Sequence, residues 1–287
     1  MSAFSDLLAS PPVICDGAVG TMLYSRAGRT DLCLDHLNLT HPSLVRSVHH
    51  DYVLAGAQII ETNTFGANRV RLAAHDLGDQ VREINTAGAR LAREEAAGRA
   101  LVAGSVGPTG RILEPYGPLT LREAQDAFGE QIEALASGGV DVIFVETMAD
   151  LREAAAAVQA AKDAGLPVAA MMSFAQEGRT MMGVSPAAAV RRLEDLDADV
   201  VGANCGTGFH DMLGVIQEMA GVAGRPVIAQ PNAGFPQSVD GRLVYASSPA
   251  YLADYARQFV GLGVAIIGGC CGTTPDHIRA IAEALRG

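Results

Sequence analysis

In Val264-Ala265-Ile266-Ile267-Gly268-Gly269-Cys270-Cys271-Gly272-Thr273-Thr274-Pro275, a short apolar run leads through a glycine-rich turn to the start of a helix. The run of Val, Ala and Ile is typical of a strand that is buried on both faces. Thr274, Pro275 and Asp276 supply an N-cap threonine, a first-turn proline and an early acid, which predict a helix start. The stretch therefore predicts one βα unit, with two adjacent cysteines between its strand and its helix.

The same alternation of strand and helix recurs along the chain. The spacing of apolar residues predicts helices over Pro42–Leu54 and Thr120–Ala136, and a capping box of Thr120 and Glu123 opens the second. Predicted strands start roughly every 25 to 45 residues, which suits βα units with occasional insertions. The eight predicted strands are Pro12–Cys15, Ala57–Glu61, Ala100–Gly104, Val140–Glu146, Pro167–Ser173, Asp199–Asn204, Pro226–Gln230 and Val264–Gly268.

Eight βα units in a chain of 287 residues are typical of a (β/α)8 TIM barrel. We find no linker rich in proline, serine or charge, and we therefore expect a single domain over residues 1–287. The alternative is an open, doubly wound sheet with one strand fewer, because periodicity leaves a strand count uncertain by about one or two. In a barrel, the polar segments that follow the strands gather at one end, and that end carries the working site.

Composition excludes several classes of partner. The net charge of −11 argues against binding to nucleic acid or to an anionic membrane, since both select a basic face. Hydrophobic residues are 49% and charged residues 18% of the chain, which supports a large core. Five cysteines is an odd number, and the N-terminus lacks the pattern of a signal peptide. We therefore expect a reducing, cytoplasmic setting and no membrane span.

Three cysteines are candidates for a metal site. Cys205 lies within Gly202-Ala203-Asn204-Cys205-Gly206, after the sixth predicted strand, and Cys270 and Cys271 follow the eighth. Neighbouring strands would bring these thiols to the same end of the barrel, and zinc suits three thiolates best. Adjacent cysteines form only a strained disulfide, which argues against a redox pair. Ordinary buried cysteines are the alternative, and we expect Cys15 and Cys33 to be core or incidental residues. His210 is expected in the first turn of the next helix, away from the metal.

Four further polar residues lie at strand ends and are candidates for the same site. Asp16 follows the first predicted strand, Glu61 and Glu146 end the second and the fourth, and Asn232 follows the seventh. The acids have a structural alternative, since a carboxylate at a strand end also serves as a hydrogen-bonding residue of the barrel rim. That alternative is favoured for Glu61. Ser105 and Thr109 follow the third strand and could shape the pocket, without an assigned role.

Taken together, these motifs resemble the homocysteine-binding domain of the homocysteine S-methyltransferase family. The resemblance runs from the first strand to the last, and its most specific parts are the Gly-Gly-Cys-Cys-Gly segment and the upstream Asn-Cys. Within the family, the chain is most similar to the N-terminal homocysteine modules of cobalamin-dependent methionine synthase and of fusions with methylenetetrahydrofolate reductase. The matching segments are Asp16–Met22, Glu61–Asn68, Gly104–Thr109, Glu146-Thr147, Gly202–Cys205, Gln230–Gly234 and Gly268–Pro275.

The resemblance implies a ligand set and a substrate site. It implies a zinc ion (Zn2+) held by Cys205, Cys270 and Cys271, with the sulfur of homocysteine as the fourth ligand. Asn232 matches a position that can take the fourth place when substrate is absent. Asp16 and Glu146 match residues that hold the amino group, and the backbone of Gly17 and Ala18 would receive the carboxylate. These are expectations carried over from the family at the matching positions.

Two functions of different classes follow from this resemblance. The first is an enzyme that methylates homocysteine to methionine, with a zinc thiolate as nucleophile. The second is a non-catalytic subunit that binds zinc and homocysteine and acts only when a partner brings the methyl group. The chain ends at Gly287, with no folate or corrinoid module after it, which keeps the second function open. An unrelated zinc lyase or hydrolase is a third reading, disfavoured because water-activating zinc sites usually carry histidines and carboxylates.

The methyl donor is left open by the sequence. Betaine and S-methylmethionine are onium compounds, and such cations prefer an aromatic cage. The chain has no Trp and only 5% aromatic residues, which disfavours these two donors without excluding them. A methyl-corrinoid on a partner protein or methyltetrahydrofolate is ranked first, from the subgroup resemblance. Oligomeric state, and the use of other thiols or selenols as acceptors, are also open. The aromatic residues expected near the rim are Tyr24, Phe65, Tyr116, Phe174, Phe209 and Phe235.

Overall fold

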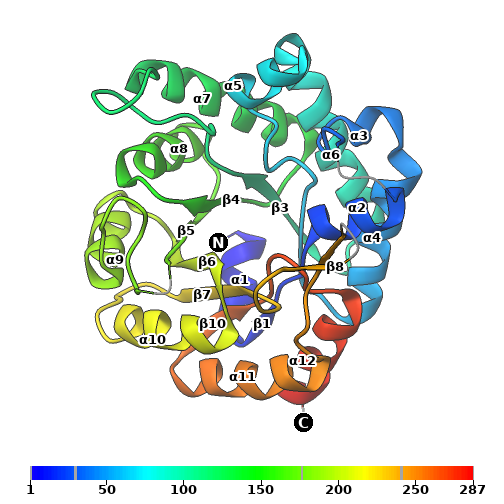
Figure 1. Cartoon of the computed structure of the whole chain (residues 1–287), viewed down its shortest axis with the longest axis vertical. Helices are drawn as coiled ribbons and strands as arrows, with labels where there is room; N and C mark the ends of the chain where they lie inside the picture. Colours follow the sequence, from blue (N-terminus) through cyan, green and yellow to red (C-terminus); the bar gives the residue numbers. More distant parts are fainter. Residues whose placement is uncertain (1, 29–30, 176, 240–241, 287) are drawn as a thin grey trace.

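A ring of helices surrounds a ring of parallel strands in the structure, a computed structural model (Figure 1). It describes residues 2–28, 31–175, 177–239 and 242–286. The sheet order is β1-β10-β7-β6-β5-β4-β3-β2, and a parallel bridge between Cys15 and Ile59 joins its first and last strands. All neighbouring strand pairs in this sheet are parallel. The prediction of a (β/α)8 barrel is therefore confirmed, and the open doubly wound sheet is wrong.

Each of the eight predicted strands is present, with bounds that differ by a few residues. The largest difference is in β6, which continues past Asn204 to Gly208 across an irregularity in its pairing with β7. The barrel strands are β1 (Val13–Ile14), β2 (Ile59–Glu61), β3 (Leu101–Val106), β4 (Val142–Met148), β5 (Val168–Met172), β6 (Val200–Gly208), β7 (Val227–Asn232) and β10 (Val264–Ile267).

The helices are more numerous than a plain alternation predicts. Extra helices α2 and α3 lie between β1 and the outer helix α4. The short helix α5 lies between β2 and the outer helix α6. The helices are α1 (Ala3–Leu8), α2 (Val19–Ala27), α3 (Leu37–Thr40), α4 (Pro42–Ala55), α5 (Arg69–Leu72), α6 (Val81–Ala96), α7 (Leu121–Gly138), α8 (Leu151–Asp163), α9 (Pro186–Asp195), α10 (Phe209–Ala220), α11 (Pro249–Gly261) and α12 (Pro275–Arg286). No helix of the described residues is long and apolar enough to cross a bilayer.

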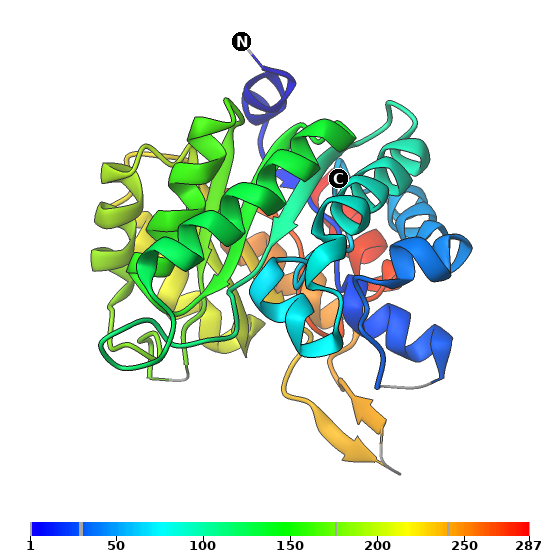
Figure 2. The ribbon, with the colours of Figure 1, turned by 90° about the horizontal axis from the view of Figure 1, so that it is seen from above.

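The two ends of the barrel are built differently. Helix α1 lies at one end, and the hairpin of β8 (Gln237–Val239) and β9 (Arg242–Val244) projects at the other (Figure 2). Phe4 of α1 is buried against inward-facing strand residues such as Val13 and Ile59, so the helix closes the amino-terminal end of the barrel. The other end, where the carboxyl ends of the strands meet, is left for a site.

Two predicted helix starts illustrate why the sequence folds in this way. Thr120 accepts a hydrogen bond from the Glu123 N–H, and the Glu123 side chain accepts from the Thr120 N–H, which confirms the capping box of α7. Helix α4 begins at Pro42, as its pattern predicts, and ends at Ala55, before the C-cap residue Gly56, whose φ of 101° suits only glycine well.

His49 of α4 makes stability depend on pH. Its side chain is fully buried, neither ring nitrogen has a hydrogen-bond partner among the described residues, and burial lowers its pKa to about 4. In the unfolded chain a histidine has a pKa of about 6.5. Between that pH and the folded pKa, the unfolded state binds a proton at His49 and the folded state does not. We expect the free energy of unfolding to fall by about 2 kcal/mol between about pH 7 and pH 5 through this residue.

Urea unfolding of the wild type and of His49→Leu at both pH values measures this effect. The variant lacks the titrating group, so its free energy of unfolding should gain about 2 kcal/mol on the wild type as the pH falls. A difference between the two proteins that is the same at both pH values would contradict the burial of a neutral His49.

Candidate metal and substrate site

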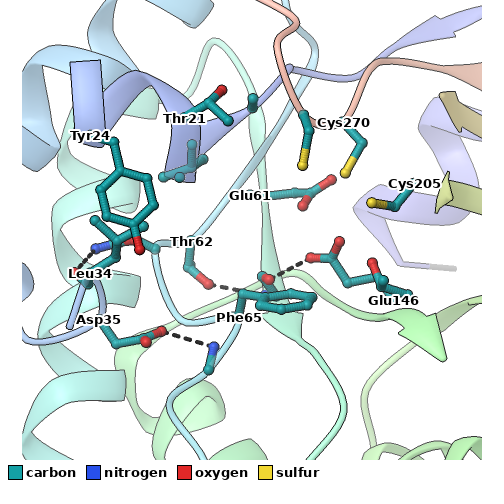
Figure 3. Close-up of a pocket in the computed structure, with 18 of the residues that line it drawn as sticks. Thr21, Tyr24, Leu34, Asp35, Glu61, Thr62, Phe65, Glu146, Cys205 and Cys270 are labelled. Atoms are coloured by element: carbon teal, nitrogen blue, oxygen red, sulfur yellow. Dashed lines mark hydrogen bonds between the residues drawn. The ribbon is translucent and has the colours of Figure 1, made fainter. Parts of the chain in front are cut away.

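A cavity of about 500 Å³ opens at the carboxyl ends of the barrel strands. Its inner part lies against β2, β4, β6 and the loop after β10, and its outer part lies against α2 and the segments around α3 and α5 (Figure 3). The inner lining includes Gly17, Ala18, Glu61, Ser105, Glu146, Asn204, Cys205, Gln230, Cys270 and Cys271, and the outer lining includes Tyr24, Leu32, Cys33, Leu34, Asp35, Phe65, Arg71 and His75.

The fold brings the three predicted metal-binding cysteines together. Strands β6, β7 and β10 are neighbours in the sheet, so Cys205 and the Cys270–Cys271 pair meet although Cys205 and Cys270 are 65 positions apart in the chain. The three sulfur atoms all lie within 4.8 Å of one another. Cys205 lies inside β6 rather than after it, in the left-handed region at φ 55°, where the strand is irregular. This backbone conformation turns its thiol toward the other two.

The loop that carries the cysteine pair is fixed by backbone contacts. The Cys270 N–H donates to the Pro231 carbonyl (2.8 Å), and the Cys271 carbonyl accepts from the Ala233 N–H (2.9 Å). Gly272 has a φ of 80°, and a Cβ placed on it would lie 2.1 Å from the ring of Tyr245. Glycine is therefore required twice over at this position, by conformation and by space. Backbone hydrogen bonds and the close approach of Tyr245 to Gly272 therefore define the turn that carries the two sulfur atoms.

The three thiols hydrogen-bond one another in an arrangement that fits a metal site. Hydrogen bonds from Cys270 and Cys271 lower the pKa of the Cys205 thiol to about 3. The same contact with Cys205 raises the pKa of Cys271 to about 11 and that of Cys270 well above its usual value. One thiolate with two neighbouring thiols is the arrangement expected of three cysteine ligands before they bind a metal. A soft cation would replace the protons on the two thiols. The residues present thus fit zinc.

Glu61 and Glu146 form the acidic part of the cavity. The Glu146 carboxylate accepts from the Ser105 hydroxyl (2.5 Å) and from the Asn204 amide (2.8 Å), while Glu61 accepts from the Gln230 amide. The two carboxyl groups also hydrogen-bond each other. Figure 3 shows both side chains turned toward the part of the pocket that holds Cys205 and Cys270.

Asp16 lies directly behind this acidic wall. Its side chain is fully buried, is not part of the cavity lining, and accepts the Glu61 N–H (2.9 Å). Burial raises the pKa of Asp16 to about 8, and burial followed by repulsion from Glu146 raises that of Glu61 well above its usual range. Burial also raises the pKa of Glu146. None of these three acids forms an ion pair with a basic side chain within the described part of the chain. A bound cation would stabilise the charged form of these buried carboxyl groups.

Three further residues of the expected site have distinct environments. Asn232 hydrogen-bonds the Cys205 thiol, while its own carbonyl oxygen is buried without a partner among the described residues. Gly17 lines the cavity, and a Cβ on it would lie 2.7 Å from the Thr273 carbonyl oxygen. The Ala18 N–H already donates to that same carbonyl (3.0 Å). The first turn of α2, whose N–H groups lack intrahelical partners, follows directly after these two residues.

Other candidate residues lie apart from the three thiols. His210 is in the first turn of α10, as predicted, and its Nδ1 bonds the Tyr255 hydroxyl (2.9 Å). Cys15 is fully buried beside Asp16 and Glu61, and burial raises the pKa of its thiol well above its usual value. A protonated thiol that donates to two carboxyl groups completes a hydrogen-bond cluster, and this oxygen-rich group suits zinc less well than the three thiols do. Cys33 is a free thiol in the outer part of the cavity.

The sequence favours a rim role for Glu61 and does not single out Asn204 as a functional candidate. Glu61 is a hydrogen-bonding residue, as expected, but it also faces the cavity beside Glu146. Asn204 fixes Glu146 through its amide group and accepts the Thr147 N–H (2.7 Å). Ser105, which had no assigned role, donates to the same carboxylate, whereas Thr109 bonds Glu153 elsewhere. A signal was present, because Glu61 and Asn204 end the second and sixth predicted strands and Ser105 follows the third.

Comparison with known proteins agrees with this geometry. The chain is 34% identical over 299 residues to methionine synthase of Mycobacterium leprae (strain TN), and 34% identical over 303 residues to that of Mycobacterium tuberculosis (strain ATCC 25618 / H37Rv). Each match covers 98% of this chain but only 25% of the relative, so the chain spans about a quarter of their length.

Solved structures of the homocysteine methyltransferase MmuM from Escherichia coli have the same fold. The metallated form superposes with a TM-score of 0.81 at 25% identity, covering 99% of both chains. The oxidized form superposes with a TM-score of 0.78 at 26% identity, covering 94% of this chain and 95% of that one. A sequence model of the homocysteine S-methyltransferase family matches residues 13–285, which is nearly the whole chain. The chain therefore belongs to the homocysteine S-methyltransferase family.

Proposed function

We propose that this chain transfers a methyl group to the thiol of homocysteine, giving methionine, at the cavity that holds Cys205, Cys270 and Cys271. The observation that carries the proposal is the convergence of three thiols and an acidic cluster in one 500 Å³ cavity. A thiol-binding group and an ammonium-binding group in one cavity match the two ends of a small amino thiol. Family membership supports the same assignment.

The three cysteines would hold a zinc ion. Their sulfur atoms already lie within 4.8 Å of one another, and the unpaired carbonyl oxygen of Asn232 lies at the same place in the barrel. Zinc bound to thiolates keeps a substrate thiol deprotonated at neutral pH, where only a few per cent of a free thiol is ionised. Free thiols at all five cysteines are in keeping with a reducing compartment such as the cytoplasm.

The acidic cluster would bind the ammonium group of homocysteine. Glu146 is the residue in direct contact, because its carboxylate lines the cavity and is aimed by Ser105 and Asn204. Glu61 contributes the second wall, and Asp16 holds the Glu61 backbone from behind. Charge-assisted hydrogen bonds of this kind contribute about 1.5–3 kcal/mol each. The ammonium would lie beside the two carboxyl groups, which hydrogen-bond each other in the structure.

The substrate carboxylate would lie at the amino-terminal end of α2. Gly17 and Ala18 line the cavity there, followed by Val19, Gly20 and Thr21. Ala18 is the N-cap residue of α2 and provides no side-chain cap, so the N–H groups of the first turn remain available. A helix start of this kind is a favourable site for a carboxylate. With the ammonium and the carboxylate fixed, the substrate sulfur would reach the three cysteines.

Methyl transfer then requires alignment more than acid–base chemistry. The protein holds the homocysteine sulfur at one fixed place, and the donor methyl group must approach in line with it. Methionine is a thioether and a poorer ligand for zinc than a thiolate, so the product would leave the cysteine site. The acidic cluster holds the amino group before and after the transfer.

A second candidate function rests on the length of the relatives. The methionine synthases that match are about four times as long as the matched region, so the same chemistry could require a partner. In that case the chain would bind zinc and homocysteine, and a methyl-corrinoid or folate protein would supply the methyl group.

Turnover of the purified chain separates the two candidates. The zinc-loaded protein is mixed with homocysteine and each of four donors: betaine, S-methylmethionine, methyltetrahydrofolate or methylcobalamin. Methionine is then measured by mass spectrometry. Formation with a free donor supports the enzyme, and formation only after addition of a corrinoid protein supports the partner-dependent subunit. Absence of methionine and of homocysteine binding under all conditions would reject both.

A further inference from the structure

The side chain of Asn204 connects the acidic part of the site with the metal-binding part. It is buried in β6, directly before Cys205, and it reaches Glu146 and Thr147 on β4 past the end of β5, the strand that lies between them and ends at Met172. Its Nδ2 donates to a Glu146 carboxylate oxygen (2.8 Å) and to the Thr147 hydroxyl (2.9 Å). Its Oδ1 accepts the Thr147 N–H (2.7 Å). One amide group therefore joins the two parts of the site.

The three hydrogen bonds require an amide of this length. An asparagine side chain has two N–H donors and one carbonyl oxygen, and here Glu146 and Thr147 engage all three. The Thr147 N–H can only donate, so it fixes the amide oxygen on its own side. Both N–H groups of Nδ2 are then directed at oxygen acceptors. Aspartate has the same shape but no donor for the Glu146 carboxylate.

The backbone is unusual at both ends of this connection. Thr147 has a φ of 59°, and the left-handed region is rare for a β-branched residue. Cys205, the residue after Asn204, has a φ of 55°. The strand pairing is irregular at both places, in β4 against β5 and in β6 against β7. Such conformations persist only where the surrounding contacts impose them, and Asn204 supplies contacts to both the N–H and the hydroxyl of Thr147.

The groups that Asn204 joins both belong to the cavity. Glu146 and Cys205 line it, and Figure 3 shows them on the same side of the pocket. Asn85 of α6 provides a contrast within the same chain. It is also fully buried, and its amide also donates twice, but to two backbone carbonyls outside the cavity lining. Asn85 supports the fold, whereas Asn204 connects two groups that would each hold a ligand.

Ligands at the two sites would favour the same arrangement of Asn204. An ammonium group at Glu146 would hold its carboxylate where the Asn204 amide donates to it. A fixed Asn204 restricts the adjacent Cys205 to the conformation in which its thiol faces the other two cysteines. Zinc would require that same conformation. Binding at one site then stabilises the arrangement that the other site needs, through a continuous chain of hydrogen bonds.

We propose that Asn204 is a positioning residue that couples the amino-group site at Glu146 to the metal site at Cys205, so that an amino acid and zinc each strengthen the binding of the other. The inference rests on the proposed function and deepens it, because it adds a regulation of the same site. A thiol without an amino group would leave Glu146 unoccupied and would meet a weaker metal site. The coupling therefore adds to the selectivity for amino thiols.

Zinc affinity in the presence of a sulfur-free amino acid tests the coupling. L-2-aminobutyrate has the amino and carboxylate groups of homocysteine but cannot bind the metal through sulfur. We expect it to tighten zinc binding by at least about 5-fold, as measured against a competing chromogenic chelator. By reciprocity, zinc should tighten the binding of L-2-aminobutyrate by the same factor in calorimetry. Butyrate, which lacks the ammonium group, should leave the zinc affinity unchanged.

Variants of Asn204 assign the coupling to this residue. Asn204→Ala retains all three cysteines, so it should still bind zinc, but the factor between the two zinc affinities should fall to about 1. Asn204→Asp is the second variant, in case the alanine variant does not fold. It still accepts the Thr147 N–H and cannot donate to Glu146, so its factor should also fall to about 1. Asn85→Ala is the matched control and should keep the wild-type factor.

A direct attraction between the ammonium group and the metal site would survive in both Asn204 variants. A wild-type factor in the folded Asn204 variants therefore overturns the proposal. Equal zinc affinities of the wild type with and without bound L-2-aminobutyrate overturn it as well. In these cases the proposed function survives, because both ligands still bind. A wild-type chain that binds neither zinc nor the amino acid overturns the proposed function together with the coupling.

Discussion

Replacing Cys270 or Cys271 by serine is expected to remove bound zinc and to lower methionine formation by more than about 100-fold. Loss of a residue that only hydrogen-bonds a metal ligand costs about 10- to 100-fold in metal affinity or activity, and loss of the ligand itself should exceed that. Each of these sulfur atoms lies within 4.8 Å of the other two cysteines, so each variant leaves an incomplete donor set. Without the metal, the substrate thiol returns to a pKa of about 8.5 and is mostly protonated at neutral pH.

Metal content and thiol reactivity measure this directly. Protein purified without chelator should carry about one zinc per chain, as three-cysteine sites do, and three thiols should become reactive when zinc is removed. Cys33→Ser is the matched control for metal content, because Cys33 is a free thiol that lies apart from the cluster. It should retain its zinc. Wild-type protein that stays metal-free after exposure to zinc under reducing conditions would show that the three cysteines have a structural role only.

The free energy of unfolding of the Cys270→Ser and Cys271→Ser variants should change little. A loss of zinc or of activity can then be assigned to the missing ligand rather than to unfolding. The cysteine pair sits in a turn held by backbone hydrogen bonds from Cys270 to Pro231 and from Ala233 to Cys271. A serine keeps those bonds, because they involve main-chain atoms only. The barrel core, which lies between the strands and the outer helices, is untouched.

The sequence predicts the barrel well because of how the strands are buried. Runs such as Val264–Ile267 and Val142–Val145 are apolar on both faces, and such runs are diagnostic of a parallel sheet covered by helices. The order of the strands then places Cys205 beside Cys270 and Cys271, because β6, β7 and β10 are neighbours in space. Neither step needs a knowledge of side-chain conformations.

The remainder of the site depends on details that no local pattern encodes. The left-handed conformation of Cys205 arises from an irregular pairing of β6 with β7, and such irregularities have no reliable sequence signal for a non-glycine residue. The hydrogen bond between Glu61 and Glu146 depends on barrel closure and on two long side chains. Helix α1 was missed because its six residues are too few for a periodic pattern.

Arg71 is another residue whose place the sequence does not predict. In the sequence it is one of two arginines in Arg69-Val70-Arg71, and nothing distinguishes it from its neighbour. In the structure, Arg69 pairs with Glu130 on the surface, while Arg71 lies over Phe65 in the cavity. The difference comes from the direction in which the short helix α5 presents each side chain.

Glu146→Gln is expected to lower kcat/KM for homocysteine by about 10- to 150-fold, which corresponds to one charge-assisted hydrogen bond of about 1.5–3 kcal/mol. Glutamine has the same shape and still accepts from Ser105 or Asn204, but it carries no charge for the substrate ammonium. The free energy of unfolding should stay the same or rise, since burial of the uncompensated Glu146 carboxylate raises its pKa. Lower activity together with unchanged or higher stability would mark a binding residue.

Two comparisons separate a binding role from a structural one. Glu153→Gln is the matched control, because Glu153 is also a buried acid that accepts from a neighbour, Thr109, but it is not part of the cavity lining. It should change kcat/KM for homocysteine by less than about two-fold. A thiol substrate without the amino group, 4-mercaptobutyrate, completes a double-mutant cycle with Glu146→Gln. If Glu146 binds the ammonium, the variant and the wild type will use this analogue equally well; if the loss of activity is the same with both thiols, Glu146 acts through the shape of the cavity instead.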